Sequence, residues 1–442
     1  MNINELKSAL QEAGVVGAGG AGFPTYAKLS EDADTVLLNA AECEPLTKVD
    51  RQLLIQNVRE ILGGMQLLVE TLGANEGIIA VKKSYTASID AISACIGEYQ
   101  KLRIHILPDV YPAGDEVVLI YEATGRVVPQ GKIPIVVGCV VVNVETALNV
   151  YRKVFEQKNV TTKFVTVAGL VRQPLTAEVP VGVTVADMIA LAGGTTDDDY
   201  AIIMGGPMTG RIVTESELVT KTTKAILVLP PSCPPVAKRR MTTKFNIRNA
   251  MSVCSQCSMC TSLCPRHLLG GAIQPHEFMR ALANGLTSGD SVNTYLNSFF
   301  CVSCGLCEMY SCHQSLSPRS LLDQYKGGLR QAGVKPPERP MKPVDPMREE
   351  RKVPEHRLVH RLGLAPFDVP APLSRHTDFE SVTLSLRQSI GAPCVPCVKK
   401  GEQVSAGQLI GQPPEGALGV CLHASISGTV TDVTDQAIMI RS

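Results

Sequence analysis

The sequence has no excess of charge of either sign, because Lys plus Arg equals Asp plus Glu at 42 each. It therefore has no overall field that would favour nucleic acid or an anionic membrane surface. It also lacks an apolar run near the ~20 residues that a membrane-spanning helix needs. Its longest run, at 133–144, is rich in β-branched residues and predicts a buried strand. We expect no nucleic-acid partner and no transmembrane segment.

A secretory signal is also missing from the start of the chain. The segment MNINELKSALQEAG has no basic stretch followed by an apolar stretch. We therefore expect a cytoplasmic setting, in which thiols stay reduced or bind metal. Thiols are abundant, and two short arrays concentrate them: CSQCSMCTSLCP at 254–265 and CVSCGLCEMYSC at 301–312.

The first array follows the pattern C-x2-C-x2-C-x3-C-P, by which bacterial-type ferredoxins hold [4Fe–4S] clusters. Three close cysteines cover one side of a cubane cluster, and in two-cluster ferredoxins the fourth ligand comes from the other array. The second array departs slightly, because four residues rather than three separate its last two cysteines. The pattern predicts two ligand sets: Cys254, Cys257, Cys260 and Cys312 for one cluster, and Cys301, Cys304, Cys307 and Cys264 for the other.

Zinc and disulfide bonds are the alternatives for these cysteines. Zinc ribbons use separated CxxC pairs, whereas each array here has one cysteine too many for a tetrahedral site. Disulfide bonds are disfavoured by the missing secretory signal. A further CxxC, Cys394 and Cys397, lies among prolines in a β-rich tail, and we interpret it as structural rather than redox-active.

Strand and helix patterns alternate from about residue 35 to 155, including a long helix at 49–72. This alternation predicts a mainly parallel α/β sheet, whose ligands bind at the carboxyl ends of the strands. Two strands and a short helix between about 160 and 212 indicate a small β-plus-helix module. Residues 334–372 have the proline-rich, charged composition of a linker. Valine-rich strands and glycine turns predict a β sandwich in the last seventy residues.

A glycine-rich loop, GAGGAGFPT at 17–25, is the second informative motif. Clustered glycines leave backbone N–H groups free to converge on phosphate. Gly17, Gly19 and Gly22 satisfy GxGxxG, but the preceding residues have a helical pattern, and a dinucleotide fingerprint needs a strand there. From the spacing alone, a phosphate site and a structural turn are equally favoured.

Four further motifs accompany this loop in the sequence: NAAECEP at 39–45, YPAGDE at 111–116, GCVVVNVETAL at 138–148 and GGPMTGR at 205–211. Together with the cysteine arrays they resemble the flavin subunit of complex I and, more closely, the C subunit of Rnf-type electron-transport complexes. In the Rnf subunit the lipoyl-like module is N-terminal, whereas here it follows the arrays. That order is similar to the family of cobalamin reductases of propanediol-utilization microcompartments.

The resemblance implies FMN as cofactor and NADH as electron donor. Glu42, Glu44 and Glu116 would be catalytic, on the flavin and nicotinamide side. Two positions depart from complex I: Ala18 stands where that family has arginine, and Asp115 is a methylene shorter than its glutamate. The implied cofactor-binding residues are Gly17, Gly19, Gly20, Gly22, Lys28, Asn39, Gly114, Asp115, Asn143 and Thr146.

The expected fold class is multidomain α/β. The predicted parts are a Rossmann-like α/β domain for FMN and NADH at 1–158, a β-grasp (SLBB-like) ligand-binding module at 159–235, a helical ferredoxin-type domain with two [4Fe–4S] clusters at 236–333, a linker at 334–372 and a lipoyl-like barrel-sandwich domain at 373–442.

The resemblance implies an electron relay that reduces cobalamin from cob(III) to cob(II) and toward cob(I), regenerating coenzyme B12 for propanediol degradation. Implied partners are a cobalamin adenosyltransferase and shell or lumen proteins, with the chain inside a bacterial microcompartment. An Rnf-type subunit that passes electrons to a membrane complex is one alternative. A non-catalytic ligand-binding scaffold with structural clusters is another.

Overall fold

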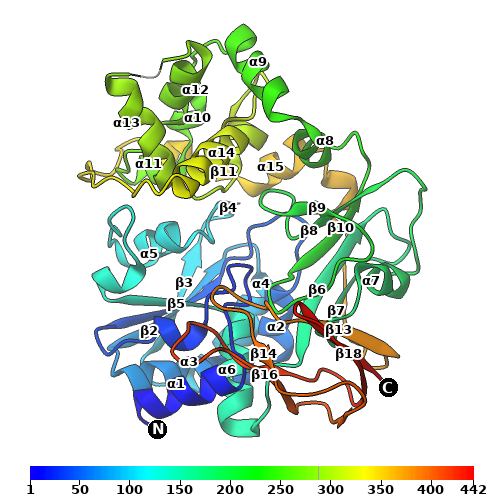
Figure 1. Cartoon of the computed structure of the whole chain (residues 1–442). Helices are drawn as coiled ribbons and strands as arrows, with labels where there is room; N and C mark the ends of the chain where they lie inside the picture. Colours follow the sequence, from blue (N-terminus) through cyan, green and yellow to red (C-terminus); the bar gives the residue numbers. More distant parts are fainter. Residues whose placement is uncertain (287) are drawn as a thin grey trace.

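The computed structural model describes residues 1–286 and 288–442. Figure 1 shows a helical cap above two sheet-containing parts, with the C-terminal strands packed beside both. Within the described residues, no helix combines the length and apolar character needed to cross a membrane.

The N-terminal part is a parallel sheet with strand order β3-β2-β1-β5. Alternate residues of β1 enter two cores: Val36 and Leu38 pack on one face of the sheet and Leu37 on the other. Helices therefore cover both faces, as the alternating pattern predicts. The strands are β1 (Thr35–Ala40), β2 (Glu76–Lys82), β3 (Leu102–Leu107) and β5 (Cys139–Asn143).

The helices of this part are α1 (Ile3–Glu12), α2 (Asp50–Gln56), α3 (Val58–Leu72), α4 (Thr86–Cys95), α5 (Glu116–Thr124) and α6 (Val144–Glu156), with short turns η1 (Thr25–Lys28), η2 (Ile96–Glu98) and η3 (Pro134–Val137). The single helix expected at 49–72 is wrong, because Asn57 has φ −126° and separates α2 from α3. The strand expected over 133–144 is shorter, since η3 occupies its start.

The second part is a mixed six-stranded sheet with order β12-β7-β6-β10-β8-β9. Its helix α7 (Val185–Leu191) begins at a capping box formed by Thr184 and Asp187. The strands are β6 (Thr162–Gly169), β7 (Leu175–Pro180), β8 (Ala201–Met204), β9 (Arg211–Val213), β10 (Ala225–Leu229) and β12 (Leu373–Arg375).

The cysteine arrays lie in the helical cap at the top of Figure 1. Its elements are α8 (Pro234–Arg240), α9 (Thr243–Val253), α10 (Met259–Ser262), α11 (Pro265–Leu268), α12 (Pro275–Ala283), α13 (Asp290–Leu296), η4 (Asn297–Phe300), η5 (Cys307–Ser311) and α14 (Pro318–Gln331).

Residues 334–372, which have the composition of a linker, are packed against the rest of the protein. Strand β11 (Val353–Pro354) pairs with β4 (Val110–Tyr111), and Leu358 and Leu362 are fully buried. Their side chains pack in a core shared with the cap and the second sheet, which fixes this segment despite its prolines. The remaining elements here are η6 (Glu349–Arg351), α15 (Glu355–Arg361) and η7 (Ala365–Phe367).

The C-terminal module consists of two small antiparallel sheets, of order β13-β19-β18-β15 and β14-β16-β17. Its apolar residues share a core with the second sheet, so this module packs directly against that sheet. The strands are β13 (Ser381–Ser385), β14 (Val395–Pro396), β15 (Gln403–Val404), β16 (Leu409–Gln412), β17 (Leu422–His423), β18 (Gly428–Val433) and β19 (Ala437–Arg441).

Candidate functional site

A cleft of about 730 Å³ opens at the carboxyl ends of β1 and β5, between the N-terminal sheet and the β8–β10 region. This is the edge at which parallel α/β sheets bind ligands. Predicted site residues that line it are Gly19, Gly20, Asn39, Glu42, Glu44, Gly114 and Asn143.

The glycine loop forms one wall of this cleft. The Gly22 N–H donates to the Gly17 carbonyl at 3.1 Å, which closes the loop and leaves Gly19 and Gly20 on the cleft. Gly20 has φ +114°, a conformation that side-chain-bearing residues rarely adopt. Thr146 supports the loop from behind, because its hydroxyl accepts from the Ala18 N–H at 3.0 Å.

Two asparagines at the strand ends hold the floor of the cleft. The Asn39 side-chain amide donates to the Gly114 carbonyl at 2.9 Å. The Asn143 amide donates to Asp50 at 2.9 Å, while its oxygen caps α6. These bonds fix the positions of both side chains and bring Asn39, Gly114 and Asn143 together at one cleft.

Two carboxyl groups also line the cleft, the buried Glu42 and the half-buried Glu44. Glu44 accepts from the Met208 N–H at 2.8 Å and from the Thr209 hydroxyl at 2.5 Å, which joins the first domain to the GGPMTGR loop. Burial raises the pKa of Glu44. The pKa of Glu42 is also raised, by burial first and then by the nearby Asp50 carboxylate. The cleft therefore holds acidic groups for which the protonated form is favoured more than in water.

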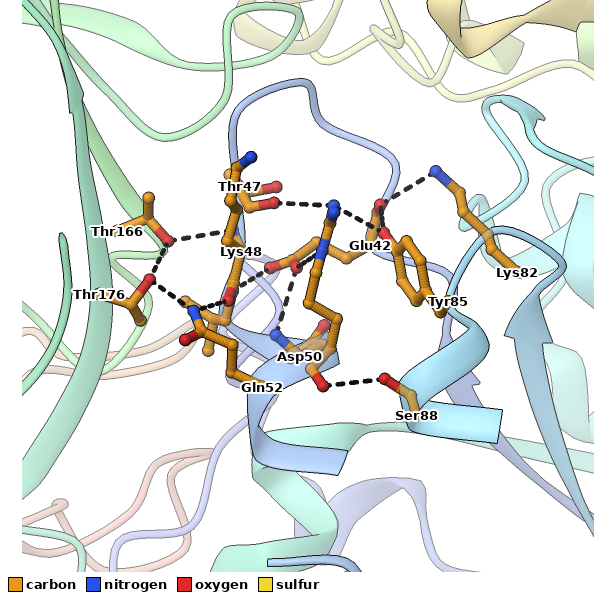
Figure 2. A network of polar contacts seen from close by, with 12 residues as sticks. Glu42, Thr47, Lys48, Asp50, Gln52, Lys82, Tyr85, Ser88, Thr166 and Thr176 are labelled. Atoms are coloured by element: carbon orange, nitrogen blue, oxygen red, sulfur yellow. Dashed lines mark hydrogen bonds and ion pairs between the residues drawn. The ribbon is translucent and has the colours of Figure 1, made fainter. Parts of the chain in front are cut away.

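Figure 2 shows how the segment carrying Glu42 and Asp50 is held between two neighbouring parts of the chain. On one side, Lys82 and Tyr85 donate to the Glu42 carbonyl, at 3.1 and 2.7 Å. On the other side, Gln52 donates to the Thr176 hydroxyl at 3.0 Å. This network fixes the cleft floor to both sheets.

Six predicted residues lie outside the cleft lining: Gly17, Gly22, Lys28, Asp115, Glu116 and Thr146. Lys28 pairs with Glu116 at 3.3 Å, and Glu116 faces a separate cavity of about 350 Å³ beside Cys301. Asp115 caps α5 and pairs with Arg266 of the cap at 3.0 Å. The structure therefore gives Asp115 a contact between domains, where the resemblance implied direct cofactor binding.

The sequence patterns did not indicate several other residues that line the cleft. Asp50 forms an ion pair with Lys224, and a segment 220–224 (TKTTK), here called the strap, lines the wall that faces the glycine loop. The sequence signal for the strap is its composition, two lysines and three threonines immediately before strand β10. The polar lining residues outside the quoted motifs are Thr47, Asp50, Thr220, Thr222, Thr223 and Lys224.

The eight predicted cluster ligands gather around two cavities in the cap. One cavity is lined by Cys264, Cys301, Cys304 and Cys307, and the other by Cys254, Cys257, Cys260 and Cys312. Across the described ranges, no group of three or more His, Cys, Asp or Glu side chains is arranged to hold a metal ion by itself. A cubane cluster takes one thiolate at each of four separate iron corners, so its ligands need not converge on a point.

The backbone of both arrays turns into the left-handed region between cysteines. Gln256, Ser258 and Ser303 have φ near +57° (56°, 58° and 58°), which is costly for residues other than glycine. Such turns wrap the chain around a central group and direct N–H groups toward it. The Ser303 N–H donates to the Cys301 sulfur at 3.4 Å, the kind of bond that tunes an iron–sulfur cluster.

Burial disfavours the free thiolate form of these cysteines. Burial raises the pKa of Cys260 to about 12 and the pKa of Cys301 to about 11. Buried thiolates without a counter-charge would be unfavourable, whereas coordination to iron stabilises the deprotonated form. Both donor sets fit a resident cluster.

Val302 connects the cluster region to the cleft. This residue lines both the cleft and the cavity of the Cys301 set. The same junction is fixed by the Tyr111 hydroxyl, which donates to the Cys304 carbonyl at 2.6 Å. The cavity of the Cys254 set has no lining residue in common with the cleft, and this set includes the exposed Cys257.

Comparisons with known proteins agree with this arrangement. Domain-level matches are the Nuo51 FMN-binding domain at 10–152, the SLBB domain at 164–212, a 4Fe-4S dicluster domain at 253–317 and the RnfC barrel sandwich hybrid domain at 370–442. The C subunit of the Na(+)-translocating ferredoxin:NAD(+) oxidoreductase complex of Acetobacterium woodii is 33% identical over 61% of this chain and 59% of its own length.

Fold, cleft and cysteine sets define an electron-relay oxidoreductase that uses FMN and iron–sulfur clusters. The chain is 43% identical to cobalamin reductase PduS of Salmonella typhimurium, over 100% of this chain and 97% of that protein. It is also 43% identical to cobalamin reductase PduS of Citrobacter freundii, over 98% and 96%. The chain belongs to the cobalamin reductase PduS family.

Proposed function

We propose that this protein oxidises NADH and reduces cobalamin one electron at a time. One NADH would convert two cob(III)alamin to two cob(II)alamin, releasing NAD⁺ and one proton. The further step toward cob(I)alamin is strongly uphill from NADH and would need a cobalamin adenosyltransferase to trap the product. Support comes from the full-length similarity to two cobalamin reductases.

The observation that carries the relay is the shared wall at Val302 between the cleft and the Cys301 cavity. When bound, FMN exchanges two electrons with a hydride donor and single electrons with iron–sulfur clusters. Within this proposal, Gly19 and Gly20 admit the cofactor close to the backbone. Glu44 orients the nicotinamide side, and its bonds from Met208 and Thr209 hold the carboxylate in place.

The two cysteine sets are proposed to hold the clusters as the spacing predicts: Cys264, Cys301, Cys304 and Cys307 next to the cleft, and Cys254, Cys257, Cys260 and Cys312 toward the outer surface of the cap. Lys28 and Glu116 are proposed to act through their ion pair, which holds the start of α5 against the glycine-loop region. Asp115 caps the same helix.

Location in a microcompartment, together with shell or lumen partners, is also part of the proposal. Its support is the family membership. Co-purification with intact microcompartments would test it, with a cytoplasmic enzyme from the same cells as the control.

The central experiment is anaerobic visible spectroscopy of the FMN- and cluster-reconstituted protein with NADH and hydroxocobalamin. We expect the cob(II)alamin spectrum to grow, and to be lost without FMN or in a Cys257→Ala variant. If NADH bleaches the flavin and clusters while the corrin stays cob(III), the acceptor is a different molecule, as in Rnf-type complexes. A protein that retains no flavin would favour a non-catalytic scaffold.

A further inference from the structure

The C-terminal module lies against the base of the glycine loop, although more than 350 residues separate them in the sequence. The Ile390 N–H donates to the Gly22 carbonyl at 2.9 Å, and the Cys421 N–H donates to the Gln11 carbonyl at 3.1 Å. The Gln11 side chain donates in turn to the Gly419 carbonyl at 3.2 Å. The loop that borders the cleft is therefore bonded to the end of the chain.

The strap also contacts this loop. A Cβ atom added at Gly22 would lie 2.7 Å from the Thr222 methyl group, so the two segments are in van der Waals contact. Thr222 and Lys224 line the cleft, where the Thr222 hydroxyl can donate to a ligand and the Lys224 ammonium lies in an ion pair with Asp50. The strap and the glycine loop thus form two walls of one opening.

Lys221 anchors the strap at the point where three segments meet. Its side chain is buried, with 2% of its surface exposed, and points away from the cleft lining. Its ammonium donates to the Gly14 carbonyl at 2.8 Å and to the Cys421 carbonyl at 3.1 Å. Its backbone N–H donates to the Gln388 side chain at 3.0 Å.

No carboxylate lies within ion-pair distance of Lys221 among residues 1–286 and 288–442. Burial lowers its pKa to about 8. A buried cation without a counter-ion is unfavourable. The two carbonyl groups that accept from Lys221 belong to Gly14 and Cys421, so its side chain joins the segment after α1 to the C-terminal module. Gly14 has φ +77°, and a Cβ there would lie 2.2 Å from the Lys221 nitrogen, so the approach needs glycine.

We propose that the strap is an FMN-binding segment and that Lys221 is the positioning residue that holds it, the glycine loop and the C-terminal module together. This inference rests on the proposed placement of FMN in the cleft. Its consequence is that a module at the far end of the chain contributes to flavin affinity without touching the flavin.

The test compares FMN affinity in two matched variants of the full-length protein with reconstituted clusters. Lys221→Met removes both carbonyl contacts of the anchor. Lys238→Met is the control, because Lys238 is also buried and donates to two backbone carbonyls, those of Ser315 and Leu316, but lies in the cap. Flavin fluorescence titration gives the dissociation constant, and iron analysis reports the clusters.

We expect Lys221→Met to weaken FMN binding roughly tenfold, since a bond from a charged donor is lost. Iron content and the far-ultraviolet circular dichroism spectrum should stay at wild-type levels, and Lys238→Met should leave FMN affinity unchanged. Equal FMN affinity in Lys221→Met and wild type would overturn the inference. Failure of wild type to bind FMN would instead overturn the proposed function.

Should Lys221→Met fail to fold, Gln388→Ala provides a second route, because it removes the bond to the Lys221 backbone and leaves the Lys221 side chain in place. It also removes a local bond, which the Gln388 amide donates to the Ser385 carbonyl at 3.1 Å. Weaker FMN binding with unchanged iron content is expected there too. Unchanged affinity in a folded Gln388→Ala protein would contradict a bracing role for the C-terminal module.

Discussion

Gly206 lies directly against Glu44, and the absence of a side chain there sets the position of the carboxylate. A Cβ at 206 would lie 2.0 Å from a Glu44 carboxylate oxygen. Gly206→Ala should therefore displace Glu44 from Met208 and Thr209 and slow flavin reduction by NADH about 10- to 100-fold. Stopped-flow absorbance measures that rate. Gly97→Ala is the control, since a Cβ there meets nothing within 4 Å; an unaffected rate in Gly206→Ala would contradict the role given to Glu44.

His423 makes the C-terminal module sensitive to acid. Its side chain is 4% exposed, and burial, followed by Lys221 and Lys153, lowers its pKa from the usual 6.5 to about 3. Between those values the unfolded chain binds a proton that the folded chain does not, so stability falls as pH drops below about 6.5. His423→Leu should recover about 2 kcal/mol of the stability that wild type loses between pH 7 and pH 5. Urea unfolding of both proteins measures this, and parallel losses would contradict it.

At the scale of elements, the contact between α3 and α6 is set by Gly64. A Cβ there would lie 2.2 Å from the Ala147 carbonyl oxygen, so alanine must separate the two helices. Gly64→Ala should destabilise the fold by about 1–3 kcal/mol and weaken FMN binding, because Asn143 on the cleft floor caps the start of α6. Gly327→Ala, within α14 and free of neighbours, should instead be neutral or stabilising. Thermal unfolding distinguishes them; equal melting temperatures would refute the packing argument.

Sequence patterns predicted features that depend on residues close together in the chain, such as hydrophobic periodicity and the spacing of metal ligands. The cysteine spacing predicted two sets of four, and the structure places those same sets around two cavities. Patterns failed where a long-range contact decides the conformation. The charged, proline-rich segment around Leu358 is fixed by a shared core. The strap is placed by Lys221 through partners near both ends of the chain, which no local period encodes.

For the whole molecule, the two cysteine sets differ in their access to solvent. Cys257 in the outer set is exposed, whereas Cys307 in the inner set is buried and its cavity adjoins the cleft. A chelator added with a mild oxidant should therefore remove iron in two phases, the faster one from the outer set. Iron release can be followed by absorbance of a coloured chelate. Cys257→Ser should abolish the fast phase and Cys304→Ser the slow one, because each removes a ligand from one set. A single phase in wild type, or a fast phase that persists in Cys257→Ser, would contradict this division of the cap into an inner and an outer cluster.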